Sequence, residues 1–396
     1  MSPAEQLTRL KARSERLIGE EVLLARLASG KPLRVKLGVD PTRPDLTFGH
    51  LVCLAKLREL QDLGHQAVLL IGDFTTLVGD PTGRSSTRPV LSPDEIRANA
   101  GTYLEQAYRI LDRGRTEVVR NGDWFGRKSF LEAIQLCRHM TVQQMLARED
   151  FAQRHAAGAP ISLVEFLYPL LQGQDSVELR SDLELGGSDQ LFNMLVGRDL
   201  QAAAGQPPQA VLTMPLLVGL DGERKMSKSL GNYIAFNDSA RDIFGKVMSV
   251  PDATMWTYYR LLLGADEAEV ARRQAQHPME SKKQLASALT AKFHGEEAGR
   301  YEREQFEKVF SKGQVRDDMP VFAWRDLAGD APEAPVVDLL AATGLFPSKK
   351  EIVRLIEGGA VKVGDARVPD RSLRLARPAD EIVIQAGKRT FLRVRA

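Results

Sequence analysis

The first half of the chain alternates short apolar runs with stretches of helical periodicity, and this alternation most constrains its fold. Strand-like apolar runs occupy residues 33–39, 67–71, 117–119 and 211–214. Between the first two runs, leucines recur every third residue from Leu51 to Leu60. Strands that alternate with helices are typical of an α/β domain with a largely parallel, Rossmann-like sheet, and we expect that architecture here.

A polar loop follows each predicted strand. Asp40 comes directly after the first strand, and the other strands lead into residues 72–81, 121–124 and 215–229. In parallel sheets, ligands collect at the carboxyl ends of the strands. The sequence therefore predicts one ligand site built from several separate loops.

The last of these loops contains the motif Lys225-Met226-Ser227-Lys228-Ser229. Gly222 and Gly231 flank the motif and predict a mobile loop rather than a helix. Ammonium groups on long, flexible side chains suit the task of following phosphate charge. An exposed basic turn would have the same composition, so the motif needs a second half of a nucleotide site to support that interpretation.

Residues 40–50 supply such a second half. Two prolines keep the segment extended, and Gly49 and His50 stand where a helix is predicted to begin. The free amides and the positive dipole end of a helix favour phosphate. Gly49 would permit close approach by a base or ribose, and His50 would donate a hydrogen bond to a phosphate oxygen. Alone the segment could equally be a rigid turn; together with the lysine motif it predicts a nucleotide site.

A second ligand is indicated by residues 168–175. On a helix, Tyr168, Gln172 and Asp175 lie on one face, while apolar residues between positions 163 and 171 surround them. Burying a hydroxyl, an amide and a carboxylate is costly unless a polar ligand meets them. A solvated helix face is the alternative, and the apolar surroundings argue against it.

These motifs together resemble the class I aminoacyl-tRNA synthetases. Thr47-Phe48-Gly49-His50 is similar to the His-Ile-Gly-His signature of that class, and the lysine motif is similar to its second signature. The helix at 168–175 resembles that of the bacterial tyrosyl members. The resemblance implies activation of tyrosine by ATP with Mg2+ and transfer to the 3′ end of tRNA(Tyr), with no tightly bound metal or organic cofactor. It also implies a homodimer, with residues 139–145 as a candidate contact between the subunits.

The same resemblance assigns roles residue by residue. It implies that four residues act in catalysis: Thr47, His50, Lys225 and Lys228. ATP binding is implied for Asp40, Gly49, His50, Gly187, Asp189 and Lys228. Tyrosine binding is implied for Gly38, Thr75, Asp80, Asn121, Tyr168, Gln172, Asp175 and Gln190. The positions of Arg84 and Arg88 match family positions implicated in the transfer to tRNA.

Two residues depart from the family pattern. Thr47 replaces the first signature histidine, so it can donate a hydrogen bond but carries no imidazole. Lys36 stands where many members have a tyrosine that helps to bind the phenol. An inward Lys36 would change the partner of the phenol; otherwise the residue points away and the role falls to another group.

The C-terminal part has a different character. Residues 347–396 carry 12 Lys and Arg against 6 Asp and Glu. This charge alone would fit a polyanion-binding module and a merely solvated tail equally well, and together with the resemblance it favours the module. Ser348 and Glu351 form a capping-box pattern before a helix, and strand-like runs follow. We expect a catalytic domain at 1–231, a helical domain at 232–327, a linker at 328–335, and at 336–396 a small basic RNA-binding domain like that of a ribosomal protein.

Composition excludes several classes of protein. The 396 residues contain two cysteines, too few for a disulfide framework or a cysteine zinc site, and both are expected to be buried thiols. No apolar run could span a bilayer and the N-terminus has no apolar signal core, so we expect a cytoplasmic protein without membrane contact.

Three other functions are rivals of the tyrosyl interpretation. They are a tryptophanyl enzyme, another nucleotidyltransferase of this fold, and a non-catalytic RNA-binding relative.

Overall fold

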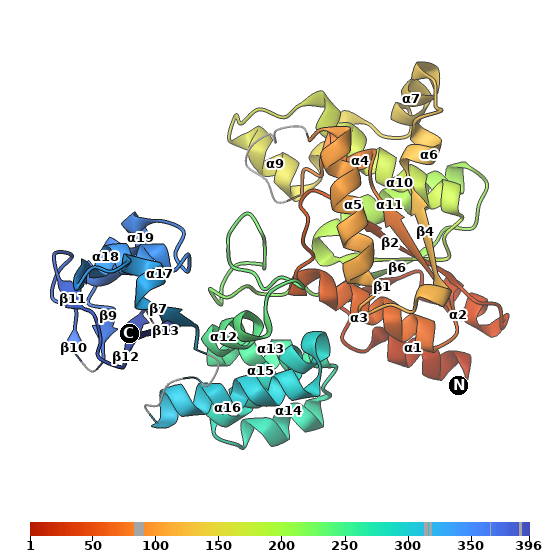
Figure 1. Ribbon diagram of the computed structural model, residues 1–396. Helices are drawn as coiled ribbons and strands as arrows, with labels where there is room; N and C mark the ends of the chain where they lie inside the picture. The colour runs from red at the N-terminus through yellow and green to blue at the C-terminus, as the bar shows by residue number, and fades with distance from the viewer. Residues whose placement is uncertain (83–90, 313–315, 317–318, 365, 388–389) are drawn as a thin grey trace. The chain divides into compact units, whose positions relative to one another are not determined.

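The structure is a computed structural model that describes residues 1–82, 91–312, 316, 319–364, 366–387 and 390–396 (Figure 1). The chain divides into two compact units, residues 1–299 and 300–396. The finer division expected from the sequence, with boundaries after residues 231, 327 and 335, stays a prediction.

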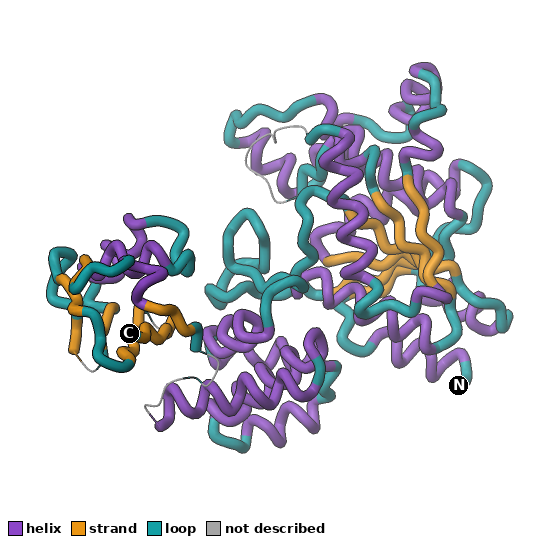
Figure 2. The backbone as a smooth tube through the Cα atoms, viewed as in Figure 1, coloured by secondary structure: helices purple, strands orange, loops and turns teal. Residues whose placement is uncertain are grey.

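The first unit is built on a six-stranded sheet, drawn in orange in Figure 2. Its strands are β1 (Arg16–Ile18), β2 (Arg34–Val39), β3 (Gln66–Ile71), β4 (Thr116–Arg120), β5 (Leu183–Gly187) and β6 (Ala210–Met214), in the order β1-β6-β5-β2-β3-β4. All neighbours pair in parallel except β1, which pairs antiparallel with β6. The predicted α/β fold with a largely parallel sheet is confirmed, whereas β1 and β5 were not among the predicted strands.

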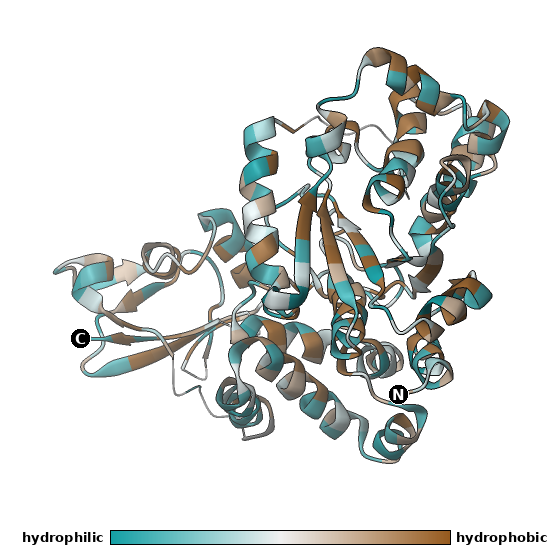
Figure 3. Cartoon of the chain, turned by 90° about the vertical axis from the view of Figure 1, so that its right-hand side faces the viewer, coloured by the Kyte–Doolittle hydropathy of each residue, from teal (hydrophilic) through white to brown (hydrophobic). Residues whose placement is uncertain are grey.

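Helices surround this sheet in the first unit. They are α1 (Pro3–Lys11), α2 (Glu20–Ala28), α3 (Phe48–Asp62), α4 (Thr75–Val78), α5 (Pro93–Ala107), α6 (Gly122–Phe125), α7 (Phe130–Cys137), α8 (Val142–Leu146), α9 (Glu149–Ala156), α10 (Leu167–Leu179) and α11 (Leu191–Ala203). β3 is apolar on both faces because helices lie over both, and its residues from Ala67 to Ile71 are buried. The central strands are accordingly largely brown in Figure 3.

Helix α3 shows how the local sequence sets an element that positions the site. Thr47 is its N-cap in an extended conformation, so Gly49 and His50 fall in the first turn. The leucines predicted to repeat at helical spacing are buried against the sheet. Gly64, just past the end of the helix, adopts a φ of 95°, a conformation that glycine reaches without steric cost.

The order of the strands places a crevice between β2 and β5. From β2 the chain continues to β3 on one side, whereas from β5 it continues to β6 on the other. Where the direction of winding reverses, the loops at the carboxyl ends of the two strands diverge and leave room for a ligand. Asp40 follows β2 at this point, and a 3₁₀ turn at Ser188–Gln190 follows β5.

Helices continue beyond the sheet: α12 (Ala240–Ser249), α13 (Asp252–Leu263), α14 (Glu267–Gln274), α15 (Pro278–His294) and α16 (Glu296–Lys312). Phe293 of α15 stacks on Phe48 of α3 with ring centroids 5.1 Å apart, and it lies 4.7 Å from the ring of Phe236. These aromatic contacts join α15 to α3 and to the segment at Phe236, in keeping with one compact unit through residue 299.

The second unit is a small α+β structure, as predicted. Its elements are β7 (Val321–Ala323), α17 (Trp324–Ala328), β8 (Glu333–Pro335), α18 (Val336–Ala342), α19 (Lys349–Glu357), β9 (Val361–Val363), β10 (Ala366–Arg367), β11 (Arg374–Ala376), β12 (Glu381–Ala386) and β13 (Thr390–Arg395). One sheet has the order β10-β9-β12-β13-β7, and β8 pairs with β11. Strand β8 thus lies within the residues predicted as linker.

Two sequence expectations meet a specific outcome in these elements. Ser348 caps α19 by accepting from the amide of Glu351, which confirms that half of the predicted capping box, while the Glu351 side chain accepts from Arg354. Arg393 and Arg395 of β13 both pair with Glu381, at 3.4 and 3.3 Å, so part of the positive charge expected of this domain is neutralised within the unit.

The expectation of two buried thiols is wrong for Cys137, which is exposed at the end of α7, while Cys53 on α3 is partly buried. Across the portion of the chain that the structure describes, no helix combines the length and the apolar character needed to cross a membrane.

Candidate active site

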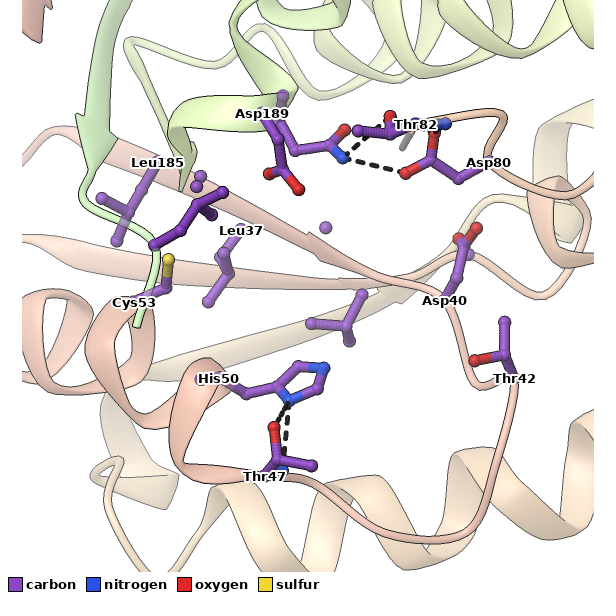
Figure 4. A pocket seen from close by; sticks show the side chains of 18 of the residues that line it. Leu37, Asp40, Thr42, Thr47, His50, Cys53, Asp80, Thr82, Leu185 and Asp189 are labelled. Atoms are coloured by element: carbon purple, nitrogen blue, oxygen red, sulfur yellow. Dashed lines mark hydrogen bonds between the residues drawn. The ribbon is translucent and has the colours of Figure 1, made fainter. Parts of the chain in front are cut away.

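A cavity of about 410 Å³ opens at the carboxyl ends of β2 and β5 (Figure 4). Most of the predicted site residues line it, namely Gly38, Asp40, Thr47, Gly49, His50, Thr75, Asp80, Tyr168, Gln172, Asp175, Gly187, Asp189, Gln190, Lys225 and Lys228. Asn121 lies fully buried behind this wall and reaches it through hydrogen bonds. Arg84 and Arg88 fall outside the described residues.

Figure 4 shows two opposite sides of this cavity. Asp80 and Asp189 lie on one side, and His50 with Thr47 lies on the other. Asp40 stands at the edge between them. The acidic groups and the helix start are therefore separated by the open space itself, which suits a ligand with cationic and anionic ends.

His50 is fixed by the residue that begins its helix. The Thr47 amide lies 3.1 Å from His50 Nδ1 and the Thr47 hydroxyl 2.9 Å from the same atom. An amide can only donate, so Nδ1 accepts and a neutral ring carries its proton on Nε2. Burial, with the nearby charge of Lys228, lowers the pKa of His50 to about 3. His50 is thus a neutral hydrogen-bond donor through Nε2.

The lysine motif is seated between both sides of the cavity. Its backbone is held by a bridge between Val218 and Lys225 and by Asn232, whose Oδ1 accepts from the Ser227 amide at 2.9 Å. Lys225 Nζ lies 2.8 Å from Asp189 Oδ2. Lys228 Nζ donates to the Tyr103 hydroxyl at 2.9 Å and to the carbonyl of Asp45. Both ammonium groups therefore have protein partners in this structure.

Asp40 organises the edge of the cavity. Its Oδ1 accepts from Thr75 Oγ1 at 2.8 Å, and its Oδ2 accepts from the Tyr168 hydroxyl at 2.9 Å. A Cβ on Gly72 would lie 2.1 Å from Asp40 Oδ1, so only glycine leaves room for this arrangement. The Tyr168 oxygen donates its proton to Asp40 and keeps lone pairs with which to accept from a ligand.

Asp80 has a dense set of partners. Gln190 Nε2 donates to its Oδ2 at 2.8 Å, and Thr82 Oγ1 donates to its Oδ1 at 2.5 Å. The buried guanidinium of Arg148 lies 3.8 Å from the same carboxylate. These contacts fix the direction of Asp80, and Arg148 was not predicted, since it belongs to a loop far from any of the motifs.

A buried amide holds two of the predicted tyrosine-binding side chains together. Asn193 Nδ2 lies 3.0 Å from Gln172 Oε1 and 2.9 Å from Gln190 Oε1. Asn193 itself is 1% exposed. Because it orients both glutamine oxygens, the nitrogens of Gln172 and Gln190 point elsewhere, and Asn193 is a functional residue that the sequence motifs did not indicate.

Asp175 lies at the closed end of the cavity. Trp124 Nε1 donates to its Oδ1 at 3.0 Å and Asn121 Nδ2 to its Oδ2 at 3.3 Å. Burial raises the pKa of Asp175 to about 7, although the charge of Lys36 and these two donors oppose the shift. Asp175 thus combines a buried carboxyl with two fixed donors, an arrangement suited to receive one further hydroxyl.

Lys36 is buried in the protein interior but does not face the cavity, so of the two alternatives left by the sequence the structure favours the one in which it points away from the ligand. Its ammonium is fully buried and lies 2.8 Å from Glu184 Oε1. It does not line the cavity, whereas Glu184 does. Glu184 was missed; the signal that could have found it is a lone lysine in the apolar run at 33–39, because a buried lysine calls for a buried acid.

In the regions that the structure describes, no group of three or more His, Cys, Asp and Glu side chains is placed to hold a metal ion.

Comparison with known proteins adds independent evidence. Residues 28–311 match the family of tRNA synthetases class I (W and Y). A tyrosine--tRNA ligase of Thermotoga maritima is 48% identical over 400 residues, covering 100% of this chain and 98% of the relative. One from Aquifex aeolicus is 44% identical over 395 residues, covering 100% and 99%. A truncated mitochondrial tyrosyl-tRNA synthetase of Aspergillus nidulans has a TM-score of 0.65 at 22% identity over 78% of this chain and 94% of that one, a likeness of fold.

Proposed function

The chain belongs to the tRNA synthetases class I (W and Y), and we propose from this premise how its site ligates tyrosine to tRNA. The enzyme activates tyrosine with ATP to tyrosyl-adenylate and pyrophosphate, then transfers the tyrosyl group to the 3′ end of tRNA(Tyr). The observation that carries the assignment of the site is Asp175, a buried carboxyl with two fixed donors at the closed end of the cavity.

Tyrosine would lie with its phenol against Asp175 and its ammonium among Asp80, Tyr168 and Gln172. The Tyr168 oxygen has free lone pairs, and Asp80 supplies the negative charge that an ammonium needs. Gly38, Thr75, Asn121 and Gln190 support this end: Gly38 by leaving space, the other three by fixing Asp40, Asp175 and Asp80. This proposal assigns each predicted tyrosine-binding residue a task that its contacts support.

ATP would occupy the side of the cavity at the start of α3. Nε2 of His50 donates to a phosphate oxygen, and Gly49 allows the nucleotide to approach the backbone, while Asp189 and Gly187 hold the ribose. Thr47 acts here mainly through His50, because both its amide and its hydroxyl lie against Nδ1. Mg2+ would arrive with ATP as part of the substrate.

Activation would require no side chain as nucleophile or general base. The tyrosine carboxylate, already ionised near neutral pH, attacks the α-phosphorus in line; a new O–P bond forms as the bond to the β-phosphate oxygen breaks and pyrophosphate leaves. Catalysis then comes from positioning and from stabilising the developing charge. Lys225 and Lys228 would exchange their present partners for the phosphates as that charge develops.

In the second step a ribose hydroxyl at the 3′ end of tRNA attacks the tyrosyl carbonyl and AMP leaves. Arg84 and Arg88 remain our candidates for contacts at this stage. The second compact unit, with its excess of basic residues, is our candidate for the RNA-binding module.

Pyrophosphate exchange tests the function directly. Purified protein is offered ATP, labelled pyrophosphate and either tyrosine, tryptophan or phenylalanine. We expect exchange with tyrosine alone. Exchange with tryptophan would show the tryptophanyl alternative, and none with any of the three would indicate a non-catalytic relative.

We also propose that the enzyme works in the cytoplasm as a homodimer. Helices α7 and α8, on either side of residues 138–141, expose large apolar side chains to solvent: Phe130 (82%), Leu131 (61%) and Val142 (63%). Exposed apolar groups close together mark contact surfaces. Sedimentation velocity on the protein and on Phe130→Glu should give a dimer and a shift toward monomer; a monomeric wild type at micromolar concentration would refute this.

A further inference from the structure

Two of the elements that line the cavity, strand β2 and helix α10, have residue spacings that match. Lys36 and Gly38 of β2, and Asp40 just after its end, are each two residues apart, so the alternation of side chains along extended chain places them on the same side, about 7 Å apart. Along α10, successive turns four residues apart are about 6 Å apart. Because these spacings are similar, β2 and α10 can be in contact at two points about one helical turn apart and leave a gap between these two contacts.

The structure has side-chain hydrogen bonds at both of these contact points. At one end the Tyr168 hydroxyl donates to Asp40 at 2.9 Å. At the other, Lys36 Nζ donates to the carbonyl of Gln172 and to the hydroxyl of Ser176, both at 2.9 Å. Gly38 lies between, and among the described residues, its two chain neighbours aside, a Cβ built on it would have only Leu70 Cδ2 within 4 Å, at 3.8 Å. The gap left by Gly38 is part of the cavity.

Glu184 is the third partner of the Lys36 ammonium and also binds α10. Its carboxylate lies 2.8 Å from Lys36 Nζ and accepts from Gln172 Nε2 and Ser176 Oγ, both at 3.2 Å. The lysine thus contacts a carbonyl, a hydroxyl and a carboxylate, which uses its three donor protons. Gln172 is held here by its backbone and its side chain at once.

We propose that Lys36 is a positioning residue for tyrosine. Together with Glu184 it links α10 to β2 on the side of Gly38 away from Asp40. This link holds Gln172 and Asp175 in the positions that tyrosine binding requires. The inference rests on the proposed function of the cavity. A buried ion pair is weak evidence for a stabilising role, because apolar replacements of such pairs are often neutral. Its contacts to the helix that carries three substrate-binding residues point to orientation instead.

The test compares Lys36→Met with a matched control, Lys56→Met. Lys56 is equally buried, lies 2.9 Å from Glu59 and donates to the carbonyls of Arg9, Leu10 and Ala12, away from the cavity. In tyrosine-dependent exchange we expect Lys36→Met to raise the KM for tyrosine about tenfold to a hundredfold, with a much smaller change in the KM for ATP. Lys56→Met should lower the melting temperature comparably and leave the KM for tyrosine unchanged.

A double variant, K36M/E184Q, separates orientation from stability. It removes both buried charges, so the melting temperature should recover while the KM for tyrosine stays high, since the contact to the Gln172 carbonyl is still missing. Equal KM shifts in Lys36→Met and Lys56→Met, or a wild-type KM in the double variant, would overturn the proposal. If Lys36→Met does not fold, the double variant decides.

The wild-type reaction keeps the two proposals apart. Absence of tyrosine-dependent exchange in the wild type would refute the proposed function. Normal exchange in the wild type, together with an unchanged KM in the double variant, would refute the role of Lys36 alone.

Discussion

The two ends of the cavity use lysine in opposite ways. Lys36, under the tyrosine end, is fully buried and bonded to groups that belong to the scaffold. Lys225 and Lys228, at the ATP end, sit on a loop; the Lys225 side chain is 38% exposed, and its partner Asp189 is itself a predicted ligand of the nucleotide. One end has fixed partners and the other has partners that a substrate can replace.

Energetics explain why this difference matters. Breaking a buried ion pair leaves an uncompensated charge and costs about 3–5 kcal/mol. An ion pair near solvent contributes about 0–1 kcal/mol, so phosphate can displace Asp189 from Lys225 at little cost. On the proposed function we therefore expect the tyrosine end to be built before the substrate arrives and to govern affinity and selectivity. We expect the ATP end to change partners during the reaction, so that its contacts act on kcat.

The strongest test of this contrast is Lys228→Ala. We expect activation to fall about a hundredfold to a thousandfold, the range for loss of one donor to a developing charge. Tyrosine binding, measured by equilibrium dialysis, should hardly change, because Lys228 belongs to the other end of the cavity. Near-normal activation in this variant would remove the proposed role of the loop.

Asp175→Asn should have the reverse signature. Loss of the charged acceptor weakens a hydrogen bond worth about 1.5–3 kcal/mol, so the KM for tyrosine should rise about tenfold to a hundredfold with a smaller change in kcat. Preference for tyrosine over phenylalanine should fall by a similar factor, since the hydroxyl is what distinguishes them. An unchanged preference would mean that the phenol does not meet Asp175.

The pH dependence of tyrosine binding probes the same residue without a mutation. Burial raises the pKa of Asp175 to about 7, so below pH 7 the carboxylate form becomes scarce, about tenfold per pH unit. If tyrosine binds to the carboxylate, its affinity should fall as the pH drops below 7 and level off above it. His50, with a pKa of about 3, remains neutral across this range and adds no step. Titration calorimetry from pH 5.5 to 8 measures the slope, and Asp175→Asn should abolish it.

The smallest expected effect is that of Tyr103→Phe at the ATP end. This change removes the hydroxyl that Lys228 contacts and keeps the ring beneath the ammonium, 5.2 Å from its centroid. Net loss of one hydrogen bond, about 1 kcal/mol, corresponds to a three- to tenfold decrease in kcat for activation. The KM for tyrosine serves as the internal control, and a larger change in that KM than in kcat would contradict the division between the two ends.

Features encoded locally were accessible from the sequence. The start of α3 at Gly49 and His50 and the common face of Tyr168, Gln172 and Asp175 depend on residues at most seven positions apart. Helical periodicity and strand alternation fix such relations before any tertiary contact forms. The same holds for the parallel sheet, which follows from apolar runs that alternate with helices.

Pairings across the fold were not accessible in this way. The contact from Lys36 to the Gln172 carbonyl spans 136 residues, and that from Lys228 to Tyr103 spans 125. Such a pair depends on which strands are neighbours and on side-chain direction, and β5, which brings Glu184 beneath α10, was not among the predicted strands. The direction of Lys36 could therefore be posed as a question by the sequence and answered only by the fold.

Strand β2, which carries Lys36 and Gly38 and leads into Asp40, also limits how the sequence of this enzyme can change by insertion and deletion. Insertion or deletion of one residue within β2 would turn part of the set Lys36, Gly38 and Asp40 to the opposite face of the sheet and so destroy this side of the cavity. This side of the cavity can therefore change by substitution but not by insertion or deletion. Among descendants of this enzyme we therefore expect β2 to keep its length while its side chains vary.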